Sequence, residues 1–428
     1  MRYILCWLLA AALPVAAAEA RHGDKKPPTG AIRATAEGAL SLSRAIRLAL
    51  ENNPDLHASD ARKDAAAGRA LQSRAWPNPE LEVFSQDMPA NRSRMSQAKH
   101  MAGISQVIPY PGKKKADIAM GTADAAVGSA AWRLHRAELV RAVKIAYCQV
   151  QTAERTATVA GDLVQVAQAA AAAAAKRNAA GEIPLQEQIR AEIQLEQTQT
   201  EKVSAIRETA VARQQLVVLL GRPDLREAPL TDAPDESADF ARSSWVPSAW
   251  LDGHPAMVAA RARRDHAVAT LRRAGLEPLP DVKVGLAGGR DEAAEENLME
   301  LRFTLPLPLF DRSKGKRLEA QAGVREAEAD IVATEQRLIA EWRAAIARYK
   351  AAAQQVAAHR DRILPKSEQA LRLVQSGFEE GKFGYLDLLD IQRTTAEARM
   401  IYQKKLFELN SARAELEALA EPVPAGGK

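Results

Sequence analysis

Two stretches of the chain alternate apolar and polar residues and then pass into very long helical patterns. In residues 299–305, Met, Leu, Phe and Leu fall on one face, and Glu, Arg and Thr fall on the other. This is the two-residue period of a β-strand. Prolines at 306 and 308 end the strand, because proline cannot donate a ladder hydrogen bond. Residues 101–108 and the PYPG sequence after them repeat the arrangement. A short strand that leads into a long helix is therefore predicted twice.

The other elements complete two similar units. Asn53-Pro54 interrupts a helix predicted over residues 41–75 and kinks or splits it. Gly181 and Gly381 let the chain reverse between long helices, since glycine adopts backbone conformations that other residues avoid. Pro365 predicts a local bend. The predicted strands cover residues 80–86, 101–108, 281–287 and 299–305, and the predicted long helices cover residues 115–180, 185–220, 316–380 and 386–420.

The plan of the first unit recurs about 200 residues later, which indicates an internal duplication. Asn53-Pro54-Asp55 recurs as His254-Pro255-Ala256, and Pro77-Asn78-Pro79-Glu80 recurs as Pro278-Leu279-Pro280-Asp281. The predicted organisation is a signal peptide (1–20), a flexible segment (21–40), a first repeat (41–224), a linker (225–246), a second repeat (247–420) and a C-terminal tail (421–428).

The N-terminus has the pattern of a secretory signal peptide. Arg2 precedes an apolar core over residues 4–15, and small residues then predict cleavage near residue 18 or 20. Cleavage would remove Cys6 and leave Cys148 as the only thiol, so no intramolecular disulfide is expected. Cys6 lies too close to the start to be a lipoprotein cysteine. No other stretch is apolar for the roughly 18 residues that a spanning helix needs, although alternating strands can also span a membrane.

Composition favours long helices over a conventional large core. Apolar residues make up 47% of the chain and aromatic residues only 4%, which is typical of helices packed through small side chains. The net charge of +5 is spread along the chain, and no basic cluster with stacking aromatics predicts nucleic-acid binding. The histidines show no helical pairing and no adjacent cysteine, and no catalytic or phosphate-binding motif is present. We therefore expect no enzymatic activity, no cofactor and no local metal site.

The number of strands carries a physical argument about assembly. Four strands with one apolar and one polar face cannot close a membrane barrel, because the smallest such barrels use about eight strands. An open strand edge cannot remain in lipid. If these strands span a membrane, several copies must combine them, and three copies would give twelve strands. The periodicity leaves open one alternative, a small soluble sheet packed against a helix.

The motifs of this duplicated plan resemble those of the TolC family of outer-membrane efflux proteins, over residues 41–420. The resemblance rests on Asn52-Asn53-Pro54-Asp55, Trp76-Pro77-Asn78-Pro79, the segments 106–113 and 305–312, and Gly381-Lys382-Phe383-Gly384-Tyr385 with the Leu and Asp residues that follow it. The proline motifs further resemble the heavy-metal branch, which serves cobalt, zinc, cadmium or copper efflux.

This resemblance implies a mainly α fold with a small β-barrel contribution. Three identical chains would form a 12-stranded barrel in the outer membrane on top of an α-helical barrel in the periplasm. The implied partners are the other two chains of a homotrimer, a periplasmic adaptor, a proton-driven inner-membrane pump of the RND class and outer-membrane lipid.

The resemblance also assigns roles to particular residues. Asp387 and Asp390 imply a periplasmic gate, where three copies would form acidic rings that favour cations. The alternative is an ordinary acidic face, which suits the dipole near a helix start. The tip turns would meet the adaptor, and packing between subunits is the alternative for their aromatic residues. These tip residues are Gly181, Phe378, Gly381, Lys382, Phe383 and Tyr385, and the lipid-facing candidates are Leu81, Val83, Val282, Val284, Leu286, Leu301, Phe303 and Leu305.

The resemblance thus implies the outer-membrane channel of a tripartite system that exports heavy-metal cations. A duct for organic drugs or for secreted protein is the alternative among channels. A periplasmic adaptor would need a single hairpin flanked by β-rich segments, and a coiled-coil scaffold would sustain strict heptads. Two hairpins and two pairs of strands argue against both of these non-channel alternatives.

Overall fold

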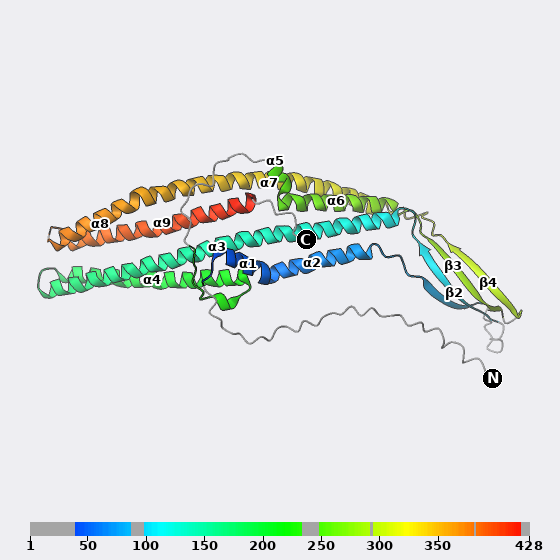
Figure 1. Ribbon diagram of the computed structural model, residues 1–428, viewed down its shortest axis with the longest axis horizontal. Helices are drawn as coiled ribbons and strands as arrows, with labels where there is room; N and C mark the ends of the chain where they lie inside the picture. Colours follow the sequence, from blue (N-terminus) through cyan, green and yellow to red (C-terminus); the bar gives the residue numbers. More distant parts are fainter. Residues whose placement is uncertain (1–38, 87–97, 233–247, 292–293, 381, 421–428) are drawn as a thin grey trace, which may run out of the picture. The chain divides into compact units, whose positions relative to one another are not determined.

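The computed structural model describes residues 39–86, 98–232, 248–291, 294–380 and 382–420 (Figure 1). From Leu40 onward they belong to one compact unit. The predicted signal peptide, the flexible segment up to residue 38, most of the linker and the C-terminal tail lie outside the described residues.

In the first half, two helices precede two strands, and two long helices follow. Asn53 lies between the first two helices in an extended conformation, and Pro54 begins the second, where its missing N–H costs nothing. The last helix ends at Gly221, which adopts a left-handed conformation with φ of 64°. The elements are α1 (Leu42–Asn52), α2 (Pro54–Gln72), β1 (Glu80–Gln86), β2 (Lys99–Ile108), α3 (Lys113–Ala179) and α4 (Leu185–Leu220).

The second half repeats this order with one interruption. A π-helical turn at His359–Ile363 separates two helices where one bent helix is predicted. Pro365 explains the break, because proline lacks an N–H and its ring collides with the carbonyl four residues earlier. The elements are α5 (Ser248–Gly253), α6 (Pro255–Leu276), β3 (Val282–Asp291), β4 (Glu296–Thr304), α7 (Lys314–Ala358), α8 (Leu364–Glu379) and α9 (Tyr385–Ala420).

The second strand pair is longer than the alternation predicts. β3 continues past residue 287 to Asp291, and β4 begins at Glu296, which pairs with Asp291. From composition alone, residues 288–291 are typical of a loop, because they are glycines and charged residues. They remain in the ladder because their backbone groups pair with β2 on one side and β4 on the other.

Helix α3 is the element that joins the parts of the molecule. It contacts α2, α4, α6 and α9 (Figure 1). Small residues permit this close packing: a Cβ on Gly121 would lie 2.5 Å from Ser73 Oγ, and one on Gly128 would lie 3.0 Å from the Ala66 Cβ. Two apolar clusters contain the buried side chains of Tyr147 and Tyr349, one cluster for each tyrosine.

The last residue of the predicted flexible segment and the first residues of the predicted linker pack against the helices. Leu40 is 2% exposed and forms a parallel bridge with Leu230. Tyr147 Oη donates a hydrogen bond of 2.8 Å to the Leu40 carbonyl, and Leu42 N–H donates to Asp232 Oδ2 at 2.6 Å. Prolines and acidic residues predicted a linker here, and these long-range hydrogen bonds hold its first residues against α1 and α3.

The four strands form one antiparallel sheet in the order β1-β2-β3-β4. The central pair, β2 and β3, joins the two halves through ten residue pairs from Lys99↔Asp291 to Ile108↔Val282. Within the described residues, β1 and β4 are therefore the two edges of the sheet.

Candidate functional site

One face of the sheet is apolar and exposed in the single chain. The register sets Leu81, Ile104, Leu286 and Leu301 side by side in one row across all four strands. Between 54% and 75% of each of these residues is exposed. A continuous exposed apolar surface marks contact with a membrane or with another protein.

The residues predicted to face lipid lie on this face or directly beyond it. Leu305 follows the last residue of β4 and is 49% exposed, while Val282 and Val284 are half-buried. Ile108 and Met299 share the face, as does Ile104, although the prediction omitted all three. The alternation in residues 101–108 and 299–305 is the signal that identifies them. The predicted residues within strands are Leu81, Val83, Val282, Val284, Leu286, Leu301 and Phe303.

The opposite face carries several charged residues, and four of them are called here the sheet charge cluster: Glu82, Lys283, Glu300 and Arg302. Lys283 Nζ lies 2.8 Å from Glu82 Oε1, and Arg302 Nη2 lies 2.7 Å from Glu300 Oε1. Lys283 Nζ also lies 2.8 Å from Glu80 Oε2 on the same face. Arg302 Nη1 also approaches Glu82 Oε2, on the far edge strand, at 3.4 Å. The same guanidinium lies over the Phe84 ring, 4.8 Å from its centroid. The two faces of the sheet therefore suit two different environments.

Small residues on the two central strands permit this contact across the sheet. Ser105 Oγ donates a hydrogen bond of 2.8 Å to Glu82 Oε1. A Cβ on Gly103 would lie only 2.6 Å from the Ala287 Cβ, so no larger residue fits there. Sequence reasoning missed the cluster because it depends on the order of the strands, which brings residues about 200 positions apart onto one face.

The turn between α3 and α4 is built around Gly181. Its φ of 74° lies in the left-handed region that glycine tolerates. Gly181 N–H donates to the Asn178 carbonyl and Glu182 N–H to the Arg177 carbonyl, both at 2.9 Å. Arg177 Nε also pairs with Glu182 Oε2 at 3.0 Å. This turn needs glycine for its backbone, whatever partner it meets.

The turn between α8 and α9 differs in its contacts. Gly381 and the side chain of Tyr385 lie outside the described residues. Lys382 is exposed and pairs with Glu380 at 2.5 Å. The Phe383 ring lies so close to Gly377 that a Cβ there would be 2.3 Å from it. Since 45% of Phe383 is exposed, this ring is available to a partner.

Phe378 has a different position from Phe383. It packs against an apolar cluster made by α3 and α4, which contains Ala170, Ala174 and Ala191. Arg177 lies over its ring at 5.5 Å. Phe378 therefore joins the two hairpin ends within one chain, which leaves less of it for an adaptor.

Asp387 and Asp390 lie in the first two turns of α9, and both are exposed. Asp387 Oδ2 accepts a hydrogen bond of 2.9 Å from Gly384 N–H. This is the bond by which an acidic residue in the first turn satisfies a free N–H at the start of a helix. Asp387 thus has a local structural role in the single chain. Asp390 does not take part in this capping hydrogen bond.

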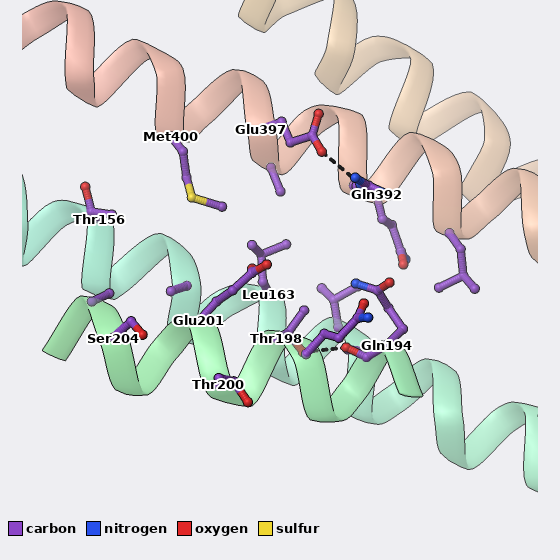
Figure 2. Close-up of a pocket in the computed structure, with 18 of the residues that line it drawn as sticks. Thr156, Leu163, Gln194, Thr198, Thr200, Glu201, Ser204, Gln392, Glu397 and Met400 are labelled. Carbon is purple, nitrogen blue, oxygen red and sulfur yellow. Dashed lines mark hydrogen bonds and ion pairs between the residues drawn. The ribbon is translucent and has the colours of Figure 1, made fainter. Parts of the chain in front are cut away.

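Asp390 also lines a cavity of about 650 Å³ between α3, α4 and α9. Figure 2 shows polar side chains from α4 and α9 around it, among them Gln194, Glu201 and Gln392. Gln392 Oε1 is buried and has no hydrogen-bond partner. Sequence reasoning did not find this polar space, because it forms where the two hairpins meet.

Neither a helical membrane span nor a metal cluster is found in the part of the chain that the structure describes. No described helix is both long and apolar enough to cross a membrane. Over the same ranges, no group of three or more His, Cys, Asp and Glu side chains could hold a metal ion.

Comparison with known proteins gives consistent matches over most of the chain. Residues 45–222 and 245–420 match the model of the family described as outer membrane efflux protein. The cobalt-zinc-cadmium resistance protein CzcC of Cupriavidus metallidurans is 29% identical over 389 residues, which cover 90% of both chains.

Solved structures share the fold. A membrane protein from Pseudomonas aeruginosa aligns with a TM-score of 0.78 and 23% identity, over 89% of this chain and 90% of that chain. The outer membrane protein VceC of Vibrio cholerae aligns with a TM-score of 0.73 and 19% identity, over 89% of this chain and 96% of that chain.

Proposed function

Because the chain belongs to the outer membrane efflux protein family, we propose that it forms the outer-membrane channel of a tripartite system that exports heavy-metal cations. The family predicted from the sequence motifs is confirmed. Membership makes the chain a transport component and not an enzyme.

The observation that carries the proposal is the sheet. Its apolar face is exposed, its other face holds the sheet charge cluster, and its two edges have no neighbouring strand among the residues that the structure describes. Such a sheet is stable in lipid only if its edges are paired and its charged face lines water. Three copies joined edge to edge satisfy both conditions with twelve strands, while the paired long helices extend into the periplasm.

Resemblance in sequence supports the proposed cargo. The match to a cobalt-zinc-cadmium resistance protein extends over 90% of both chains, and the proline motifs point to the same branch. The channel then receives metal cations from an inner-membrane RND pump through a periplasmic adaptor, which contacts the tip turns at Gly181 and Phe383. Weak, transient contact with the wall suits a duct, since tight binding would slow release.

Assembly and conduction test the channel itself. We expect the mature protein, extracted in detergent, to have the mass of a homotrimer and to conduct ions in a planar bilayer. A water-soluble monomer without conductance would overturn the proposal. A conducting trimer whose loss leaves metal tolerance unchanged but raises sensitivity to organic drugs would keep the channel and reject the metal cargo.

Substitution at the proposed gate tests selectivity. Asp387→Asn combined with Asp390→Asn removes both charges, while an asparagine oxygen can still accept the Gly384 N–H hydrogen bond. We expect the cation preference of single channels to fall and block by divalent cations to weaken. Glu408→Gln, farther along the same helix, is the matched control. Unchanged selectivity in the double variant would remove these two residues from the gate.

A further inference from the structure

The apolar face of the sheet ends in a row of polar residues. The register sets Ser85, His100, Arg290 and Asn297 side by side across all four strands, and these four are called here the polar outer row. Alternation along a strand places Ser85 on the same face as Leu81, since side chains two or four positions apart share a face. All four residues are exposed. The polar outer row therefore borders the exposed apolar surface directly.

This row lies at the end of the sheet away from the helices. Helix α2 leads into the start of β1, and β2 leads into α3 after Ile108, so the helices join the opposite end. With the helices in the periplasm, as the proposed function has them, the row belongs to the outer leaflet of the membrane.

The length of the strands agrees with this position. His100 and Ile108 stand at positions 100 and 108 of β2, which is about 26 Å along the strand and roughly 20 Å across a membrane if the strand tilts by about 40°. The apolar band of a membrane barrel is about 25 Å tall. The polar outer row therefore lies near the outer boundary of such a band.

The polar outer row offers positive charge and hydrogen-bond donors. Arg290 supplies a guanidinium, and the imidazole of His100 can take up a proton. Ser85 Oγ and His100 Nδ1 share a hydrogen bond of 2.8 Å, and the ring has a second nitrogen for another partner. Arg290 also interacts within its own chain, but its five N–H donors can serve more than one acceptor. These groups suit an anion that accepts several hydrogen bonds.

The carboxylates at this end of the sheet lie on the other face. Asp291 and Glu296 pair in the ladder one position away from the row, so alternation sets them on the face of the sheet charge cluster. Lys99 Nζ lies 3.8 Å from Asp291 Oδ2 on that same face. The polar outer row contains a permanent cation and no carboxylate, so its own members do not neutralise its charge.

We propose that the polar outer row binds the phosphate of a phosphorylated glycolipid in the outer leaflet, of the lipopolysaccharide kind. Arg290 and His100 donate hydrogen bonds to phosphate oxygens, while Ser85 and Asn297 bond to hydroxyl groups of the adjoining sugar. The acyl chains lie on the apolar rows next to it, which include Leu286. This inference rests on the proposed function, because it requires the sheet to span the outer membrane.

The surroundings of the row favour a lipid over a free anion. Val83 and Met299 lie in the next row toward the helices, and they are 76% and 82% exposed. A ligand that covers both rows must be anionic at one end and apolar at the other. A guanidinium binds phosphate through parallel charged hydrogen bonds, whereas a free phosphate ion would leave the apolar row in contact with water.

Lipid binding to the delipidated trimer in detergent tests the proposal. We expect Arg290→Gln to weaken the binding of deep-rough lipopolysaccharide about tenfold, the effect of losing one charged hydrogen bond. Adding His100→Gln should weaken it further, and Arg290→Lys, which keeps the charge, should recover part of the affinity. Arg312→Gln is the matched control, since Arg312 is exposed beyond the opposite end of β4. Equal losses for the 290 and 312 variants would overturn the assignment.

Probes of different chemistry identify the group that is bound. Lipopolysaccharide stripped of its phosphates should bind wild-type protein about as weakly as the intact lipid binds Arg290→Gln. Phosphatidylglycerol should also bind more weakly, because its phosphodiester carries a single charge and no phosphorylated sugar. Stripped lipopolysaccharide or phosphatidylglycerol that binds as tightly as the intact glycolipid would overturn the proposal.

Fluorescence quenching tests the depth of the row without relying on affinity. In a background with Cys6→Ser and Cys148→Ser, Asn297→Cys and Leu301→Cys each carry a fluorescent label in phosphatidylcholine vesicles. A nitroxide on the lipid headgroup should quench the label at 297 more strongly, and a nitroxide in the middle of the acyl chain should quench the label at 301 more strongly. The reverse order, or no difference, would reject the placement of the row at the membrane boundary.

Failure of this inference differs from failure of the proposed function. Wild-type protein that conducts as a trimer but binds the glycolipid no better than Arg290→Gln rejects only the lipid site. Wild-type protein that neither assembles nor conducts rejects the channel.

Discussion

Helices α2 and α6 begin in the same way, yet Asn53 caps the first and His254 the second. Asn53 Oδ1 accepts the Leu56 N–H at 2.9 Å, and its Nδ2 donates to the Leu219 carbonyl of α4 at 2.9 Å. His254 Nδ1 accepts the Ala256 N–H at 3.2 Å. The first cap also joins two helices, and the second contains an imidazole, which can take up a proton as the pH falls. The equivalent caps of the two halves therefore differ in their sensitivity to pH.

The long helices show a second difference. Helix α3 runs through 67 residues without a break, while its counterpart is divided by the π-helical turn before Pro365. Helix α3 contacts helices of both halves, so a break there would disturb more of the molecule. The duplication therefore tolerates an interruption on the outer side of the chain, where α7 and α8 have fewer neighbours.

The largest effect is expected from moving that interruption into α3. Gln165 is exposed, and it precedes Pro365 by the same spacing that separates Gly181 from Gly381. Gln165→Pro should destabilise the protein by about 3 kcal/mol, since proline in a helix interior removes a hydrogen bond and introduces a clash. The denaturation midpoint of the detergent-solubilised protein measures the loss.

Two controls separate the backbone from the side chain. Gln165→Ala should leave the midpoint nearly unchanged, because alanine suits an exposed helical position. Pro365→Ala should change stability by less than about 1 kcal/mol, since the surrounding turn already accommodates the break. Equal losses for Gln165→Pro and Gln165→Ala would show that the side chain, not the continuous backbone, matters in α3.

The alternation and the proline positions predicted the strands and the long helices because both signals are local. Arg302 illustrates what remained hidden: its contact with Glu82 depends on the strand order, which no local period encodes. Asp291 was unpredictable for a similar reason, since its pairing with Glu296 rests on the backbone ladder and not on apolar residues. Leu40 follows a segment of loop-like composition, yet the hydrogen bond from Tyr147 and the backbone hydrogen bonds with Pro229 and Thr231 fix it.

A smaller loss is expected at the cap of α2. Asn53→Ala removes both the acceptor for Leu56 N–H and the donor to the Leu219 carbonyl at a site only 4% exposed. We expect a loss of roughly 2–3 kcal/mol, which combines a lost cap with an unsatisfied, partly buried carbonyl. Asn53→Asp keeps the cap and should lose less. Denaturation midpoints of the two variants separate these two contributions. Equal losses of stability in both variants would assign the whole effect to the hydrogen bond with the Leu219 carbonyl of α4.

The titrating cap of α6 should make the second half sensitive to mild acid. Burial lowers the pKa of His254 below its ordinary value of 6.5, so the unfolded chain binds the proton more readily. Its contribution to stability is present above that ordinary value and is lost as the pH falls through the lowered value. His254→Asn keeps a capping side chain and should remove this pH-dependent loss, and Asn53→His should introduce it into the first half. Denaturation midpoints measured between pH 8 and pH 5 test this prediction. Parallel curves of midpoint against pH for wild type and His254→Asn would contradict the assignment.

The smallest effect concerns the contact between the halves at Cys148. Burial raises the pKa of this thiol to about 11, and the charge of Glu417 on α9 adds to the rise. At pH 8 about one molecule in a thousand would carry the reactive thiolate, so labelling by iodoacetamide should be slow. Glu417→Gln should accelerate it modestly, since the substitution removes the opposing charge and the Lys144–Glu417 pair at 2.9 Å. A cysteine at the exposed position 165 gives the rate for an open helix surface. Labelling of Cys148 at that same rate would mean that α3 and α9 separate in solution, and the two halves would then be joined less firmly along their helices than through β2 and β3.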